Sequence, residues 1–244
     1  MKKIIVVISI VALYILLAFV ISNYVGNDTY LLMGENVRFH YHNGEWTNDE
    51  NEEKYTNCQV YDKNDYSYLG KYTASYTSDW HIDMNKSVIN NDVLLFRSNK
   101  KLKLLSIKRN YELEDSEVKK ALAKFKLPTD GYLGYYVSAD IDNDGNIEYI
   151  YSITNVDVGM YRKASEYYTL IYMVKDNDII EISLEKSNMY LSSVYEIGYI
   201  LNVDKNSDYE LIITKGGIIK ETNEMYADMY GLIDGKYVKL VGTN

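Results

Sequence analysis

Cysteine and proline are almost absent from this chain of 244 residues, which contains one of each. A single cysteine, Cys58, cannot form an intrachain disulfide, so stability must come from core burial and bound ions. Cys58 also lies far beyond the end of the N-terminal apolar run, where a lipoprotein carries its acylated cysteine. The sequence therefore excludes a disulfide scaffold and a lipoprotein.

Common catalytic and nucleotide-binding motifs are also missing. The sequence has no glycine-rich phosphate loop, no Gly-x-Ser-x-Gly and no His-Glu-x-x-His. His40 and His42 share a strand face without an identifiable third metal ligand, and His81 has no evident serine or cysteine partner. We predict no catalytic residues. An exported, glycosidase-like hydrolase stays open as the alternative, because it needs only two carboxylates at a distance that no sequence reveals.

Acidic residues outnumber basic residues beyond the N-terminus. Setting Lys2 and Lys3 aside leaves 24 basic and 35 acidic residues, a net charge of −11. Such a protein is a poor partner for nucleic acid and for anionic lipid headgroups, and a good partner for divalent cations.

One long apolar run lies at the N-terminus. Lys2 and Lys3 precede the uncharged residues 4–21, which with their flanking residues are long enough to cross about 30 Å of hydrocarbon. The first charges after the run are Asp28 and Glu35, so the positive-inside rule places the N-terminus in the cytoplasm. We predict a single-pass cell-membrane anchor with the bulk of the chain outside the cytoplasm. The alternative is a cleaved signal peptide and a secreted protein.

Tyrosine is abundant, with 27 residues against 4 phenylalanines, and short runs of Ile, Val, Tyr and Thr alternate with Asn, Asp and Gly. This pattern favours β-strands joined by tight turns, so we predict a mainly β fold. Residues 1–27 are expected to form the cytoplasmic tip and transmembrane helix, 28–110 a β-hairpin domain and 111–130 a connector helix. Residues 131–244 are expected to form two tandem four-stranded units, propeller-like or arranged as an open sandwich.

Three hairpins are expected in the first domain. Strand 37–42 meets Trp46 across Asn43-Gly44, which fits a type I′ turn. The other two hairpins pair residues 58–61 with 66–72 and residues 93–96 with 102–105.

The connector helix shows a capping residue and an apolar face. Asp115 or Ser116 is expected to cap its N-terminus, and Pro128 to end it. The residues expected on its buried face are Val118, Leu122 and Phe125.

Each of the two tandem units is expected to contain four strands. The first unit comprises residues 135–139, 147–154, 168–175 and 179–184. The second comprises residues 197–201, 211–215, 226–233 and 237–241.

A loop rich in carboxylates joins the first two strands of each unit. In the first acidic loop, residues 140–148, oxygen-bearing side chains alternate along the chain, a glycine permits a bend and a carboxylate ends the loop. The second acidic loop, residues 202–210, has the same spacing 62 residues later. Four carboxylates on the first loop repel one another unless a divalent cation lies among them. The alternative is an acidic turn, since Asp, Asn and Gly favour turns.

The first loop is not an EF-hand, because the twelfth position is Tyr151, within an expected strand. It resembles the calcium loops of FG-GAP and VCBS repeats, which also occur in the propellers of integrin α-subunits. The resemblance covers about residues 134–155 and 196–215 and lacks the Phe-Gly and Gly-Ala-Pro signatures of full FG-GAP units. It implies calcium ligands at Asp140, Asp142, Asp144, Asn146 (backbone carbonyl) and Glu148, and at Asn202, Asp204, Asn206, Asp208 (backbone carbonyl) and Glu210.

The first loop is expected to bind calcium more tightly, because the second has Asn202 and Asn206 where the first has aspartates. We therefore predict a non-enzymatic, membrane-anchored extracytoplasmic protein in which calcium rigidifies a β scaffold. Its loops are expected to bind a surface polymer, a carbohydrate or another protein.

Overall fold

The computed structural model describes residues 29–33, 37–42, 44–48, 54–62, 65–76, 80–82, 93–98, 102–156, 164–191, 193–203, 208–217 and 226–243. The described residues are mainly β, in antiparallel sheets, with one α-helix. The predicted membrane anchor lies outside them. Among the described residues, no helix has both the length and the apolar character needed to span a membrane.

The N-terminal part of the chain forms a seven-stranded sheet in the order β3-β2-β1-β7-β4-β5-β6. Two predicted hairpins are confirmed, since β2 pairs with β3 and β4 with β5. Gly44, at the β2–β3 turn, has a φ of 93°, as the predicted type I′ turn requires. The strands are β1 (Thr29–Met33), β2 (Val37–His42), β3 (Glu45–Asn48), β4 (Lys54–Asp62), β5 (Tyr68–Tyr76), β6 (Trp80–Ile82) and β7 (Val93–Arg97).

The third predicted hairpin, between residues 93–96 and 102–105, is wrong. Strand β7 pairs with β1 and β4, whereas β8 (Lys103–Leu105) pairs with β13 in another sheet. Leu94, Leu95 and Phe96 are all buried, so β7 requires cover on both faces. Leu94 and Phe96 pack in one core and Leu95 packs in another, so both faces of β7 are covered. Strands β1 and β4 occupy its two edges and leave neither for β8.

The C-terminal part forms two meanders, in which each strand pairs with the next. The first sheet has the order β12-β11-β10-β9, and the second has the order β16-β15-β14-β13-β8, with β8 added at its edge. The eight predicted strands are confirmed, with bounds that differ by a few residues. They are β9 (Leu133–Ala139), β10 (Glu148–Thr154), β11 (Tyr167–Lys175), β12 (Asp178–Ser187), β13 (Ser193–Asn202), β14 (Glu210–Gly217), β15 (Tyr226–Ile233) and β16 (Lys236–Gly242).

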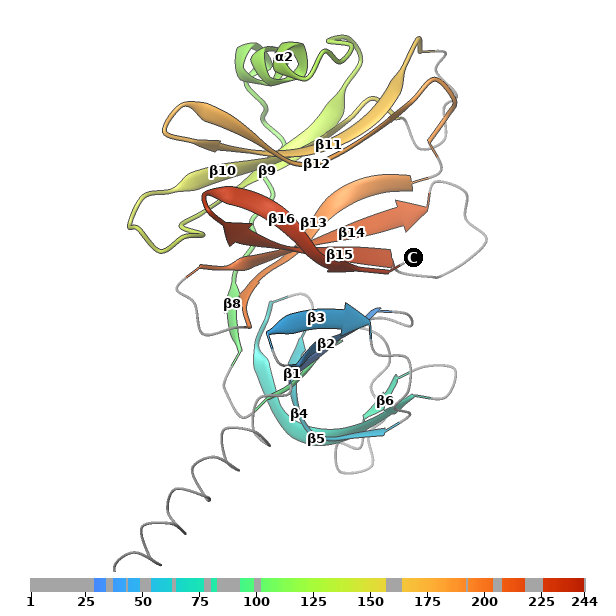
Figure 1. Cartoon of the computed structure of the whole chain (residues 1–244), viewed down its shortest axis with the longest axis vertical. Coiled ribbons are helices and arrows are strands. Elements are labelled where there is room, and N and C mark those ends of the chain that lie inside the picture. The colour runs from blue at the N-terminus through green and yellow to red at the C-terminus, as the bar shows by residue number, and fades with distance from the viewer. Residues whose placement is uncertain are drawn as a thin grey trace, which may run out of the picture.

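The three sheets stack face to face, with α2 (Asp115–Lys124) lying over the outer face of the β9–β12 sheet (Figure 1). Strand β14 shows how the middle sheet serves two cores, because side chains alternate between the faces of a strand. Leu211 and Ile213 belong to the core shared with the β9–β12 sheet. Ile212, between them, belongs to the core shared with the N-terminal sheet, which includes Leu31. The middle sheet is therefore buried on both faces.

Helix α2 closes the stack with its apolar face. Val118 and Leu122 are fully buried and Phe125 is half-buried in the core beneath the helix, so the predicted face is confirmed. The helix ends at Lys124, several residues before the predicted end at Pro128.

The predicted N-cap of α2 is wrong. Glu114 occupies the N-cap position and makes no side-chain capping hydrogen bond, so Asp115 and Ser116 lie in the first turn. Asp115 instead accepts a hydrogen bond from the Tyr132 hydroxyl and forms an ion pair with Lys119. An acidic first turn still stabilises the helix, because it complements the positive end of the helix dipole.

Candidate metal centre

The first acidic loop connects β9 to β10 at one end of their hairpin. Ala139 pairs with Glu148 across the two strands, so the intervening residues form the connection. Ile141 is buried in the core shared by the two meanders and anchors the loop. Gly145 has a φ of 90° and nothing within 4 Å of the position of an added Cβ. The backbone conformation, rather than lack of space, therefore favours glycine at this turn.

Three aspartates of the loop accept hydrogen bonds from its own backbone. The N–H groups of Asp144 and Gly145 each donate to Asp140, over 3.1 Å. Asp144 also donates to Asp142 over 3.3 Å, and the N–H of Asn146 donates to the Asp144 carboxylate over 2.8 Å. These bonds satisfy amides that have no strand partner, as in any acidic turn, and do not by themselves point to a metal.

Glu148 differs from these aspartates because it is buried, with 1% of its surface exposed. Its Oε2 accepts a hydrogen bond of 3.0 Å from the N–H of Ile141. Burial raises the pKa of Glu148, and the neighbouring charge of Asp142 raises it further, while the bond from Ile141 opposes the rise. A carboxylate in this position gains more from a bound cation than an exposed one does.

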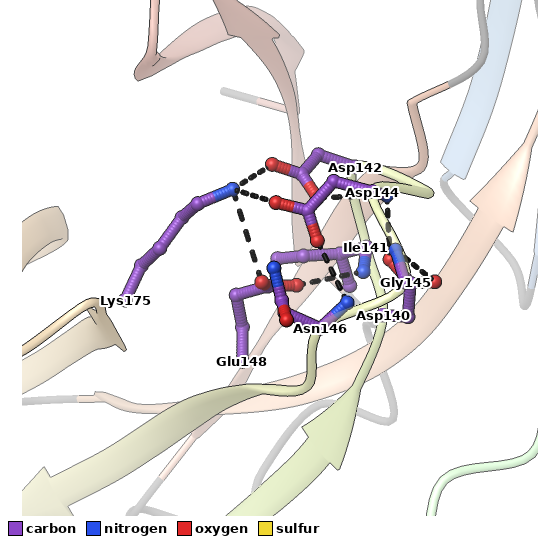
Figure 2. A network of polar contacts seen from close by, with 8 residues as sticks. All are labelled: Asp140, Ile141, Asp142, Asp144, Gly145, Asn146, Glu148 and Lys175. Atoms are coloured by element: carbon purple, nitrogen blue, oxygen red, sulfur yellow. Dashed lines mark hydrogen bonds and ion pairs between the residues drawn. The ribbon is translucent and has the colours of Figure 1, made fainter.

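Three of the predicted ligands converge. One carboxylate oxygen from each of Asp140, Asp142 and Glu148 lies within 4.8 Å of the other two, a spacing that can hold a metal ion. Asp144 and Asn146 are exposed, and the Asp144 carboxylate turns toward Lys175 (Figure 2). The structure thus brings together three carboxylates that can offer oxygen ligands, two of them half-buried and one buried.

Lys175, at the end of β11, is a member of the site that the sequence did not indicate. Its ammonium forms a short ion pair with Asp142, another of 3.0 Å with Asp144 and a third of 3.9 Å with Glu148. Figure 2 shows the ammonium facing all three carboxylates from the neighbouring strand. The hydrogen bonds to Asp142 and Asp144 raise the pKa of Lys175, so the ammonium stays charged at neutral pH. Only the strand register could have revealed it, because Lys175 lies 27 residues after Glu148 in the sequence.

A cavity of about 220 Å³ lies beside the loop. Its lining includes Asp142, Glu148, Lys175 and Tyr237, which comes from β16 of the other meander. Tyr237 is 8% exposed, and its hydroxyl has no hydrogen-bond partner among the described residues. Burial raises the pKa of Tyr237, and the nearby charges of Glu148 and Asp142 raise it further, so the hydroxyl keeps its proton.

The second acidic loop has part of the same geometry. Glu210 is 4% exposed, and its Oε2 accepts a hydrogen bond of 2.9 Å from the N–H of Val203. This bond corresponds to the one from Ile141 to Glu148, 62 residues earlier. The Asn202 side chain donates to the carbonyl of Asp208 over 2.8 Å. The predicted ligands Asp204 and Asn206 lie outside the described residues.

The two loops also touch each other. The N–H of Tyr209, in the second loop, donates a hydrogen bond of 2.8 Å to the carbonyl of Ile141 in the first. Tyr237 lies near the acidic groups of both loops, since Asp208 and Glu210 also contribute to its raised pKa.

The histidine pair of β2 lies away from these loops. The rings of His40 and His42 are 5.8 Å apart, so they share a strand face as predicted. His40 stacks on Tyr30 with a ring separation of 4.2 Å, which is a packing arrangement. The side chain of His81 lies outside the described residues.

Comparison of the chain with protein-family models, with curated proteins and with solved structures gave no match. A functional proposal for this chain therefore rests on the geometry of the first acidic loop.

Proposed function

We propose that the first acidic loop binds a calcium ion, which stabilises a β scaffold that acts as a binding module outside the cytoplasm. The convergence of Asp140, Asp142 and Glu148 carries this proposal. Their oxygens repel one another at such short separations, and a divalent cation between them removes the repulsion.

The chemistry of the ligands favours calcium over other metals. The converging side chains offer only carboxylate oxygens, whereas transition metals favour histidine and cysteine. Calcium accepts six to eight oxygen ligands in irregular geometries, while magnesium demands a near-ideal octahedron. A short loop whose aspartates also bind its own amides meets the looser requirement more readily.

The matching hydrogen bonds at Glu148 and Glu210 support a repeated unit of the FG-GAP or VCBS type. We propose that the two meanders are two such units, stacked as an open sandwich rather than closed into a ring. The second loop is then a weaker site. Its described residues Asn202, Asp208 and Glu210 hold the same framework.

The proposed location rests on the sequence. The lysines at the N-terminus and the apolar run after them support a cell-membrane anchor with the sheets outside the cytoplasm. Calcium is plentiful there, so even a modest site is filled. The proposed ligand of the module is a surface polymer, a carbohydrate or another protein.

Thermal unfolding of the full-length chain in detergent tests the calcium site. Calcium at about 100 times its dissociation constant stabilises a fold by about 2.7 kcal/mol, which predicts a rise in Tm of roughly 5–10 °C over chelator. Asp142→Ala is expected to lose this rise. Asp178→Asn is the matched control, because Asp178 lines the same cavity outside the converging group. Equal Tm values for the wild type in calcium and in chelator would show that the loop is only an acidic turn.

The binding role has a separate test. Surface polysaccharides and exported proteins of the source cell are screened against the wild type and Asp142→Ala, each in calcium. Ligands that bind the wild type and lose affinity for the variant support a calcium-stabilised module. Hydrolysis of a screened polymer by the wild type would instead favour the hydrolase alternative.

A further inference from the structure

Lys175 already supplies a positive charge to the group of carboxylates that would receive the metal. Its ammonium forms ion pairs with Asp142 and Glu148, which are two of the three converging residues. A cation bound by these carboxylates would therefore lie beside a like charge, and the two repel each other. The lysine and the metal ion compete for the same oxygens.

The second meander has no side chain at the corresponding position. Tyr149 pairs with Val174 in the first meander, so the next step of the register places Glu148 opposite Lys175. In the second meander Leu211 pairs with Tyr230, and the same step places Glu210 opposite Gly231. Strand β11 thus places the Lys175 ammonium beside Glu148, whereas β15 places a glycine, with no side chain, beside Glu210.

The cavity beside the loop gives an independent sign that a ligand enters. The Tyr237 hydroxyl is buried in its lining and has no hydrogen-bond partner among the described residues. A buried hydroxyl without a partner is costly, and a water or ligand in the cavity would relieve that cost. The cavity volume of about 220 Å³ has room for a hydrated ion and for a displaced ammonium.

We propose that Lys175 is a resident cation which a divalent ion must displace, so that this lysine sets the calcium affinity of the first loop. The inference rests on the proposed function and adds a competing side chain that regulates metal binding. The tethered ammonium neutralises part of the repulsion when no metal is bound, and it retreats into the cavity when calcium enters. A monovalent ion gains too little from the carboxylates to replace it, so the lysine also favours divalent ions.

The proposal reverses the usual effect of removing a residue from a binding site. Lys175→Met in the full-length chain is expected to bind calcium at least about tenfold more tightly than the wild type, because the ion no longer displaces a charge. Lys175→Arg keeps the charge and is expected to bind as weakly as the wild type or more weakly. Lys186→Met is the matched control, because it removes a lysine that pairs with Glu166 and leaves the cavity lining unchanged.

Isothermal titration with calcium measures these affinities, and circular dichroism establishes that each variant is folded. Lys175→Gln replaces Lys175→Met if the methionine variant fails to fold. Tighter binding by the uncharged variants, or binding by them alone, supports the proposal. Equal or weaker binding by them, with clear binding by the wild type, overturns the role of Lys175 and leaves the calcium site in place. If neither the wild type nor the uncharged variants bind calcium, the proposed site fails and this inference fails with it.

Discussion

At the scale of single residues, two carboxylates of the first acidic loop have pKa values shifted in opposite directions. Asp144 accepts the N–H of Asn146 and pairs with Lys175, and both contacts lower its pKa. Glu148 is buried, and burial raises its pKa. The charged form of Asp144 therefore stabilises the loop without any metal, whereas the charged form of Glu148 is costly even with Lys175 at 3.9 Å.

This contrast predicts how stability depends on pH in the absence of calcium. A carboxyl group whose pKa is raised by folding contributes stability below its ordinary value of 4.5, and the contribution is lost as pH rises through the raised pKa. The free energy of unfolding of the wild type minus that of Glu148→Gln is thus expected to fall as pH rises above about 4.5 in chelator. Asp144 does not obscure this window, because its lowered pKa lies beneath it.

Urea unfolding at a series of pH values measures this difference. Calcium is expected to abolish the decline in the wild type, since the bound ion stabilises the charged glutamate. A difference that instead grows with pH in chelator would mean that folding stabilises the charged form of Glu148, against the geometry described.

Some residues of the candidate site can be predicted from the sequence, and others cannot. The convergence of Asp140, Asp142 and Glu148 could be predicted because they lie within nine consecutive residues and their spacing is visible. Lys175 could not be, because it reaches the loop through the pairing of β10 with β11. The same holds for Tyr237, which comes from the other meander.

At the scale of elements, local signals decided which strands were predicted correctly. Two hairpins of the meanders have two-residue turns, Asp176-Asn177 between β11 and β12 and Asp234-Gly235 between β15 and β16, and these turn residues have positive φ. Within each meander a strand pairs with its neighbour in sequence, so strand composition and local connections were enough. Strand β8 failed this logic because its partner, β13, lies far along the chain. The pairing of β8 depends on which sheet edge is free, and no local pattern encodes that.

The placement of β8 leads to a prediction about Leu102, which directly precedes it. Leu102 is 4% exposed and lies in the core between the N-terminal sheet and the β13–β16 sheet. Leu102→Ala is expected to cost about 2–5 kcal/mol of unfolding free energy, as a cavity in a packed core does. Leu133→Ala is the matched control, because Leu133 is 53% exposed and its truncation is expected to cost less than about 0.5 kcal/mol. Chemical denaturation compares the two, and equal costs would contradict a core shared across these sheets.

At the scale of the whole molecule, the sheets pack against one another through shared hydrophobic cores. The middle sheet shares one core with the β9–β12 sheet and another with the N-terminal sheet (Figure 1). A calcium ion bound by the first loop, as proposed, would therefore act on sheets that share packed cores. The hydrogen bond from Tyr209 to Ile141 adds a direct link from the loop to the middle sheet.

This coupling predicts how far calcium protection spreads. If the layers unfold together, a ligand that binds only the folded state slows hydrogen exchange equally wherever exchange requires global unfolding. Calcium at about 100 times its dissociation constant is expected to slow the most protected amides of β10, β14 and β1 by about 100-fold each. Asp142→Ala, measured in the same calcium, is expected to show no slowing in any sheet. Slowing confined to β9, β10 and their loop would instead mean that the stack opens layer by layer, with calcium stabilising only the sheet that carries it.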